Sequence, residues 1–339
     1  MKKFMPVVIS SVLALPFAGA AQAEGPIDGE VYGKINLAIT NFDKAGAKDT
    51  SLESNASRLG FKGKTPLESG LSMVYQLEYE VNPTENSAVN TSKATGGTID
   101  GTTTGTPTGG KDTDTNIFKQ RNAFVGIAGG FGTVLAGIHD TPLKLAQGNV
   151  DQFNDLPVGD IKSLMRGEVR ATDAVVYVSP SFSNISLMAA ATQYEDADEG
   201  KNNASSVSLT YKTDNLFVAL AMDSEVAGYD VSRVAAEFKM DAFSVGAMYN
   251  SSEAVSTGAT PTVSNSSNLV SASYKMGDYK LKAQYGTGDE YKKGDTLSAF
   301  GVDYKLGKNS MLFAYTAKYE NDTANSSQKA TGLGIEHKF

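Results

Sequence analysis

The 339-residue sequence contains no cysteine, no tryptophan and only two histidines, His139 and His337. Without cysteine the chain can form neither disulfides nor thiolate metal sites. Acidic residues outnumber basic ones, 38 against 30. An acidic chain without clustered lysine and arginine argues against nucleic acid as a partner and against a polybasic membrane-binding patch.

Long apolar runs are absent after residue 23, and none approaches the roughly 20 residues that a membrane helix needs. The one apolar run, over 4–20, follows two lysines and ends in Ala21-Gln22-Ala23. This pattern predicts a secretory signal peptide over 1–23 and a mature chain over 24–339. Removing the two lysines leaves 28 basic residues against 38 acidic ones, a net charge of −10.

Instead of helical periodicity, the mature chain shows alternation of period two, which is typical of β-strands with two different faces. In 310–319 one face carries Met311, Phe313, Tyr315, Ala317 and Tyr319. Segment 71–80 repeats the pattern, with Leu77 and Tyr79 opposed to Glu78 and Glu80. A soluble β-sandwich and a membrane barrel would both produce such segments.

The spacing of the segments distinguishes these two folds. About sixteen segments can be identified, at 30–41, 56–65, 70–82, 117–128, 132–139, 172–180, 184–195, 204–213, 215–223, 232–240, 242–253, 267–276, 278–290, 294–306, 309–320 and 328–339. Their lengths suit the roughly 9–11 residues of a tilted strand that crosses a bilayer. Short turns alternate with eight longer polar gaps, which we predict to be loops, 42–55 and 224–231 among them. Tight periplasmic turns and long external loops are typical of outer-membrane barrels.

Aromatic residues gather beside the short turns, as expected for an interfacial girdle. They are Phe131, Tyr177, Phe182, Tyr211, Phe217, Phe243, Tyr274, Tyr279 and Tyr304. A closed barrel also pairs every backbone group in lipid, which an open sheet cannot do. We therefore predict an all-β fold, a transmembrane antiparallel barrel of sixteen strands in the outer membrane, with short periplasmic turns and long external loops.

The last strand carries a separate signal. Leu333, Ile335, His337 and Phe339 share one face, and the sequence ends on the aromatic Phe339. This resembles the C-terminal signal of outer-membrane proteins that the barrel assembly machinery reads. We therefore expect Phe339 to act as an assembly signal.

Several motifs resemble the general trimeric porins of Gram-negative bacteria. They are Val31-Tyr32-Gly33-Lys34, Ser57-Arg58-Leu59-Gly60-Phe61-Lys62-Gly63, Gln76-Leu77-Glu78, Arg121-Asn122-Ala123-Phe124-Val125-Gly126 and Gly130-Phe131-Gly132-Thr133. The resemblance implies a homotrimer in outer-membrane lipid and lipopolysaccharide, with the third long loop folded into the lumen. It also implies a water-filled channel for passive diffusion of small hydrophilic solutes and ions.

In such porins basic wall residues face acids on the inward loop across the pore constriction. The motifs place Lys34, Arg58 and Arg121 on the basic wall. Lys34 and Arg58 lie on polar faces of their segments, whereas the direction of Arg121 rests on the resemblance. The loop acids are expected to be Asp151, Asp155 and Asp160. Ordinary solvated wall residues are the alternative interpretation.

The third loop, 140–171, is far longer than a usual connection, and such loops are commonly functional. Its apolar residues could anchor it to the wall: Phe153, Leu156, Val158, Ile161, Leu164 and Met165. Near the end of the fifth segment, Ile138 stands where family members often carry an arginine, which weakens the case for anion preference. The second loop, 83–116, is rich in threonine, glycine and serine and cannot bury a core.

Two other functions were weighed. A channel that prefers a sugar or a phosphate needs an aromatic ladder or a lysine-rich constriction, and neither is evident. A barrel enzyme needs a proton-transfer group, for which only His139 beside Asp140 offers a candidate. Adjacent strand residues point to opposite faces, so this pair does not support catalysis. No metal, nucleotide or cofactor motif is found, and we expect no enzymatic activity.

Overall fold

The computed structural model describes residues 28–84, 118–192, 203–255, 264–321 and 327–339. Within these residues one antiparallel sheet of seventeen strand segments closes on itself, because β1 pairs with β17. The predicted signal peptide and residues 85–116 of the second loop lie outside the described residues. No helix among the described residues is long and apolar enough to cross a membrane.

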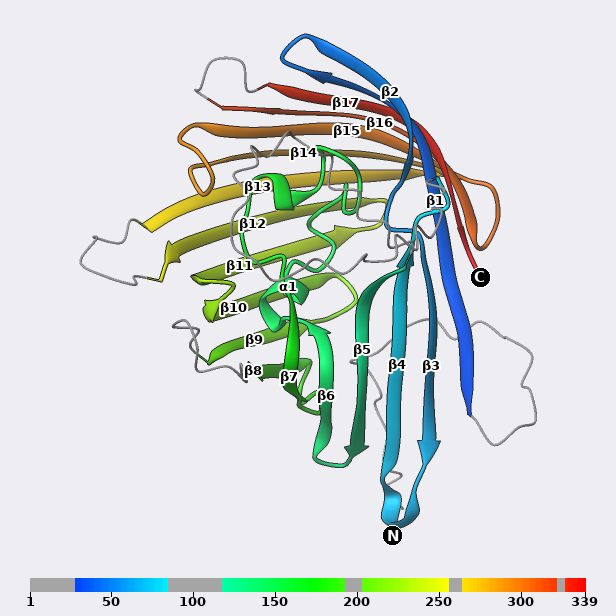
Figure 1. The fold of residues 1–339 in the computed structure, drawn as a ribbon, viewed down its shortest axis with the longest axis vertical. Helices are drawn as coiled ribbons and strands as arrows, with labels where there is room; N and C mark the ends of the chain where they lie inside the picture. Colours follow the sequence, from blue (N-terminus) through cyan, green and yellow to red (C-terminus); the bar gives the residue numbers. More distant parts are fainter. Residues whose placement is uncertain (1–27, 85–117, 193–202, 256–263, 322–326) are drawn as a thin grey trace, which may run out of the picture.

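The strands follow one another around the barrel in chain order (Figure 1). They are β1 (Gly29–Lys44), β2 (Ala47–Ser54), β3 (Arg58–Pro66), β4 (Ser72–Val81), β5 (Phe118–Gly129), β6 (Gly132–Asp140), β7 (Arg170–Val178), β8 (Ile185–Thr192), β9 (Ala204–Lys212), β10 (Leu216–Val226), β11 (Tyr229–Met240), β12 (Phe243–Ala254), β13 (Ser264–Met276), β14 (Tyr279–Gly288), β15 (Asp295–Lys305), β16 (Ser310–Glu320) and β17 (Gln328–Lys338). Helical structure in the described part is limited to α1 (Pro142–Leu145), η1 (Glu68–Gly70) and η2 (Ile161–Ser163).

β2 and β3 together form one barrel strand. β2 pairs with the second half of β1 and β3 with its first half. The strand is interrupted at Asn55–Ser57, where Ala56 takes a left-handed φ of 50°. Hydrogen bonds tie the interruption to β1, since Asn55 N donates to Asn36 O at 2.8 Å and Asn36 N donates to Ser57 Oγ at 3.0 Å. The barrel therefore has the predicted sixteen strands.

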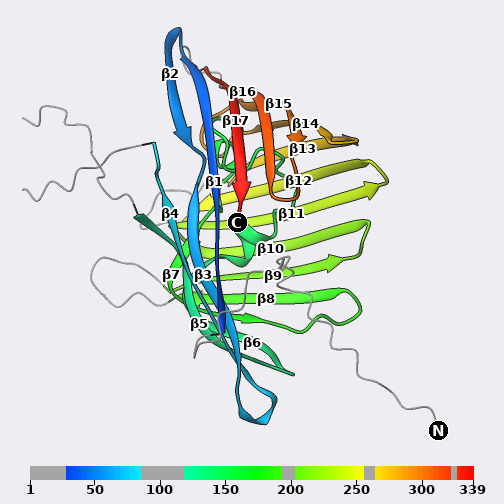
Figure 2. The same cartoon turned by 90° about the vertical axis from the view of Figure 1, so that its right-hand side faces the viewer.

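Two of the predicted loops are wrong. Residues 42–55 and 224–231 are mostly strand, and the hairpin of β1 and β2 projects beyond its neighbours (Figure 2). Each hairpin closes with a two-residue Ala-Gly turn in which both residues have positive φ, 52° and 91° at Ala45-Gly46. Such turns match the twist of the strands, but alanine is a weaker turn signal than asparagine. The polar residues around the turns therefore suggested loops.

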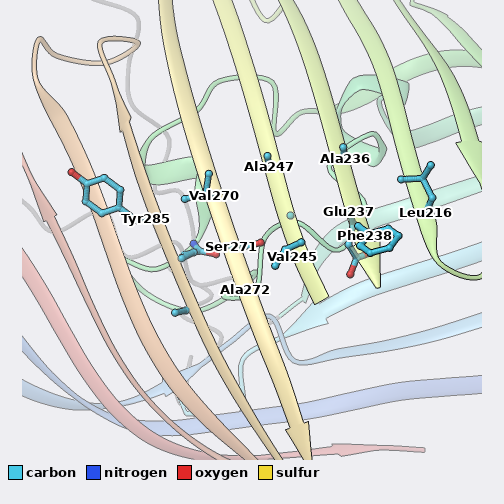
Figure 3. A pocket seen from close by; sticks show the side chains of 13 residues that line it. Leu216, Ala236, Glu237, Phe238, Val245, Ala247, Val270, Ser271, Ala272 and Tyr285 are labelled. Atoms are coloured by element: carbon cyan, nitrogen blue, oxygen red, sulfur yellow. The ribbon is translucent and has the colours of Figure 1, made fainter. Parts of the chain in front are cut away.

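The two faces of the sheet are those of a membrane barrel. On the outer face Val31, Ile39 and Leu333 are 61%, 61% and 65% exposed, whereas Asn36 and Thr40 on the inner face are almost fully buried. Figure 3 shows the outer face of β10–β14, where Phe238, Val245, Val270 and Tyr285 surround a shallow apolar groove lined by alanines. An apolar surface of this extent requires a non-aqueous environment.

The predicted aromatic girdle is present beside the short turns, with one exception. Phe131, Phe182, Phe243 and Tyr279 are about half exposed or more. Neighbouring rings also contact each other, such as Tyr279 and Tyr304 with centroids 4.8 Å apart. Phe217 does not belong to the girdle, because its side chain turns inward and packs under the third loop.

The connection between β6 and β7 lies inside the ring of strands, as predicted for the third loop (Figure 1). Its apolar residues are buried against the inner wall. Phe153 and Leu156 pack on β1 and β15–β17, Val150, Ile161, Leu164 and Met165 on β11–β13 and β15, and Leu143 and Ala146 on β10 and β11. Glycine makes room for one anchor, since a Cβ at Gly286 would lie 2.4 Å from Leu164 Cδ2.

Candidate pore constriction

Asp155, on the third loop, forms ion pairs with two cations of the barrel wall. Its Oδ2 atom accepts from Lys34 Nζ at 2.9 Å and from Arg58 Nη2 at 2.8 Å. Lys34 and Arg58 lie directly opposite each other on β1 and β3. Like charges in such a position destabilise a sheet, so the Asp155 carboxylate offsets a repulsion that the wall would otherwise carry.

The loop backbone fixes Asp155 in place. Asp155 has a left-handed φ of 67°, and its N–H donates to Asp160 Oδ2 at 2.9 Å. Burial acts to raise the pKa of the Asp155 carboxyl, but the adjacent Lys34 and Arg58 outweigh it and hold that pKa below its ordinary value. Asp155 is therefore a carboxylate that stays charged at neutral pH.

Arg121 faces the lumen because β5 contains a bulge. Leu77 pairs with Ala123 and Tyr79 with Gln120, so Arg121 and Asn122 together oppose the single residue Glu78. A bulge of this kind places two consecutive side chains on the same face. Strict alternation could not predict this direction.

The guanidinium of Arg121 is held by wall carboxylates rather than by the loop. Its Nε donates to Glu78 at 2.6 Å and its Nη1 to Glu80 at 3.0 Å. Glu78 also lies 3.9 Å from Arg58 and accepts from the Tyr32 hydroxyl. Glu336 on β17 adds another carboxylate, 3.6 Å from Lys34.

These wall carboxylates were not predicted as site residues. The sequence did place Glu78 and Glu80 on the polar face of their segment, so the signal was available. Within the described part of the chain, this cluster joins three cations, Lys34, Arg58 and Arg121, to four carboxylates, Asp155, Glu78, Glu80 and Glu336. Glu336 also pairs with Lys338 at 3.2 Å, so with Lys338 counted four cations balance the four carboxylates, and the wall is mixed in charge.

Asp151 and Asp160 do not reach this cluster. The Asp151 carboxylate accepts from Phe153 N at 2.9 Å and from Ile161 N at 3.1 Å. Asp160 accepts from Asp155 N and Lys162 N. Both side chains are buried and bind the loop's own backbone, because an irregular loop must satisfy its N–H groups locally. Among the predicted loop acids, only Asp155 meets the basic wall.

Ile138 is not a wall residue either. It pairs with Ala123, which pairs with the exposed Leu77 on the outer face. The inward neighbour is His139, whose ring lies 5.1 Å from that of Phe124. The residue of β6 that faces the lumen at this point of the wall is therefore His139 and not Ile138.

The sequence model of the Gram-negative porin family matches residues 10–324. The chain belongs to the Gram-negative porin family.

Relatives of this porin include neisserial proteins. It is 26% identical to the major outer membrane protein P.IB of Neisseria gonorrhoeae over 74% of this chain and 64% of that relative. The match thus spans somewhat less than two thirds of that relative's length. The P.IB protein of Neisseria meningitidis serogroup A is 22% identical, with both chains fully covered.

Solved structures with the same fold include an anion-selective porin from Comamonas acidovorans, with a TM-score of 0.70 and 18% identity over 92% of this chain and 99% of that one. The trimer form of OmpT from Vibrio cholerae has a TM-score of 0.63 and 15% identity over 92% of this chain and 100% of that one. At such identities these likenesses establish the fold alone.

The returning limb of the loop in this porin is held by a buried arginine. Arg233 on β11 has a side-chain exposure of 0%, and its Nη1 lies 2.7 Å from Glu168 Oε1. It also donates to Asn250 and to the carbonyl of Arg166. Arg166 in turn stacks on the ring of Tyr229 at 3.9 Å. The loop is therefore fixed to the wall by a charge as well as by apolar packing.

Phe339 lies at the closing seam of the barrel. Its N–H donates to Gly33 O at 3.1 Å, and Gly33 N donates to Phe339 O at 2.9 Å. The Phe339 ring covers Gly33 so closely that a Cβ there would lie 2.6 Å from it. The last residue thus extends the β1–β17 ladder and places an exposed ring on the outer face.

The two histidines form no catalytic arrangement in the described residues. His139 Nδ1 lies 2.7 Å from the backbone carbonyl of Asp140, not from its carboxylate. That carboxylate is instead paired with Lys144 at 2.9 Å and Arg170 at 3.1 Å. His337 contacts the Ser310 hydroxyl at 2.7 Å. An activated water between His139 and Asp140 has no geometric support.

Proposed function

We propose that this porin is a water-filled channel of the outer membrane through which small hydrophilic solutes and ions diffuse passively. The observation that carries the proposal is the loop fixed inside a closed barrel, where Asp155 meets Lys34 and Arg58. Such a loop narrows the lumen and adds no group of side chains arranged for a chemical reaction. We further propose that the protein performs no catalysis.

The constriction residues are Lys34, Arg58, Arg121 and Asp155, together with Glu78, Glu80 and Glu336. Rings of charge at the narrowest point govern which ions pass a channel. Cations and carboxylates balance in this cluster once Lys338 is counted with Glu336, so we expect at most a mild ionic preference, which we propose to be for cations. The mature net charge of −10 has the same sign, but charges farther than a Debye length of about 10 Å at 0.1 M salt count for little.

A channel that prefers a sugar or a phosphate is the alternative. A sugar ladder would require aromatic side chains along the lumen, and the large exposed aromatics lie on the outer face. A phosphate channel would require a lysine-rich constriction, and the constriction proposed here is mixed in charge. Nonselective diffusion with a small ionic preference is therefore favoured.

Assembly is proposed to follow the family. Residues 1–23 would direct export, Phe339 would engage the barrel assembly machinery, and three copies would associate in a membrane that contains lipopolysaccharide. The trimer form of Vibrio cholerae OmpT, which shares the fold, supports the trimer proposal.

Planar-bilayer recording tests the channel proposal. Purified protein should produce ion currents that close in steps of one third, and a KCl gradient should give a zero-current potential of the sign expected for cation preference. Swelling of proteoliposomes in sugars of rising size should show a size limit. Absence of any conductance from folded protein would overturn the proposal, and saturable transport of one sugar would favour the alternative.

A further inference from the structure

A group of lysines lies on the inner wall between the third loop and the short-turn end of the barrel. Lys275 on β13 and Lys280 and Lys282 on β14 all belong to the inward-facing set of their strands. Lys282 Nζ lies 5.0 Å from the centroid of the Phe153 ring on the loop. The group therefore begins directly beneath the loop and extends toward the short turns.

The charges of this group do not balance. Lys282 pairs with Asp303 at 2.9 Å, and the nearby Glu237 pairs with Lys239 at 3.2 Å. The charged groups that act on the Lys280 ammonium are Lys282, Asp303, Lys275 and Glu237. Both carboxylates among them already have a lysine partner. No ion pair is found for Lys275 or Lys280 among the residues that the structure describes.

The two unpaired lysines also face each other. Lys275 and Lys280 are direct cross-strand partners on β13 and β14. Like charges directly opposite each other destabilise a sheet. At the constriction the same conflict between Lys34 and Arg58 is relieved by Asp155. On the other side of Lys280, Asp303 of β15 is its direct cross-strand partner, but Asp303 also pairs with Lys282 at 2.9 Å. Three lysines thus share one carboxylate, and an anion from solution would offset the remaining positive charge.

The wall around the lysines also contains a serine hydroxyl and lies close under the loop. Ser273 lies opposite Lys282 on β13, and Lys282 faces Gly301 on β15. The Phe153 ring and the Lys282 side chain fill the space above Gly301, since a Cβ there would lie 3.0 Å from Phe153 Cε1 and 3.1 Å from Lys282 Cε. Glu237 and Ser271, labelled in Figure 3, lie on the neighbouring inward-facing positions of β11 and β13, one step closer to the loop. At the same level Gln284 donates to Gly159 O of the loop at 2.6 Å. The third loop thus covers the part of the inner wall that carries the lysines and Ser273.

We propose that Lys275, Lys280 and Lys282 form a binding subsite for a small divalent oxyanion, of the inorganic phosphate class, at the short-turn side of the constriction. This inference rests on the proposed channel function. With Asp303 counted, the three lysines carry an excess of two positive charges, which matches two negative charges, and ammonium and hydroxyl groups donate to several oxygens of one anion. The subsite places a positive region behind a constriction of mixed charge, so the channel is asymmetric along its axis.

Bilayer recording with inorganic phosphate tests the subsite. In symmetric KCl, phosphate added on the short-turn side should reduce the current in a saturable way, and addition on the other side should act more weakly. The double variant K275Q/K280Q should weaken the apparent phosphate affinity roughly tenfold, because it removes two charges within a few Å of the anion. The substitutions also remove a repulsion, so the folded barrel should form normally.

Lys212→Gln is the matched control, since Lys212 faces the same end of the lumen from β9. It should leave the phosphate affinity unchanged. An equal loss of phosphate affinity in K212Q would mean that phosphate responds to the general potential of the lumen and not to a site. Unchanged phosphate affinity in K275Q/K280Q would overturn the proposal directly. Normal KCl conductance without any phosphate effect would refute the subsite and leave the channel function intact, whereas absence of conductance would refute the channel itself.

Discussion

Arg58 Nη2 and Asp155 Oδ2 lie 2.8 Å apart, although 97 residues separate them in the sequence. This ion pair joins the wall of the barrel to the loop that narrows it. Because Lys34 shares the same carboxylate oxygen, one acidic side chain sets both the position of the loop and the charge of the constriction.

Asp155→Asn should move the zero-current potential toward anions. The substitution removes the only loop carboxylate that meets Lys34 and Arg58 in the described residues, so these cations lose their nearest negative charge. A shift of several millivolts in a KCl gradient is expected. Asp49→Asn, on the exposed β2 hairpin, removes the same charge far from the loop and should leave the potential unchanged. Equal potentials in D155N and wild type would mean that Asp155 does not line the conducting path.

The effect of Asp155 should persist at low pH. Its pKa lies below the ordinary value of 3.8, so the group stays ionised until the pH falls below that value. A depressed carboxyl pKa stabilises the folded state above the ordinary pKa, and this contribution is lost as the pH falls through the lowered pKa. The difference in potential between wild type and D155N should therefore remain constant from neutral pH to about pH 4 and vanish only below it. Loss of the difference near pH 5 would show that Lys34 and Arg58 do not hold the carboxylate.

Arg121 and Glu78 should have opposite and coupled effects. Arg121→Ser leaves Glu78 and Glu80 unpaired and should move the potential toward cations, whereas Glu78→Gln should move it toward anions. The double variant should lie near wild type, because the pair contributes nearly no net charge. A double variant whose potential lies far from that of wild type would show that the two side chains do not act as an opposed pair.

The barrel itself could be predicted from alternation and turn spacing, because each strand records its two faces in its own residues. The two Ala-Gly hairpins were missed since their polar flanks look like loops. The direction of Arg121 depends on a bulge, which is a relation between β4 and β5 and not a property of either segment. Loop acids carry no periodicity at all, so the sequence could not separate Asp155 from Asp151 and Asp160, which bind backbone N–H groups.

Arg233→Met should loosen the third loop. It removes the cation that is buried with Glu168, and breaking a buried ion pair costs about 3–5 kcal/mol. Single-channel current should become noisier, and the loop should be cleaved faster by added protease. The double variant R233M/E168Q removes the stranded carboxylate as well and should recover part of the stability. Quiet, wild-type currents in R233M would show that the apolar anchors alone hold the loop.

Deletion of Phe339 should strongly impair insertion into the membrane. The residue extends the β1–β17 ladder through two hydrogen bonds with Gly33 and places a ring against that glycine, so its loss removes both a seam contact and the proposed assembly signal. Phe339→Tyr retains the ring and the backbone and should insert normally, whereas Phe339→Ala retains only the backbone bonds. Heat-modifiable gel mobility of outer-membrane fractions measures the folded amount. If the seam bonds dominate, Phe339→Ala should insert like wild type and only the deletion should fail; if the aromatic ring is the signal, both should fail. Normal amounts of folded protein after deletion would contradict either role.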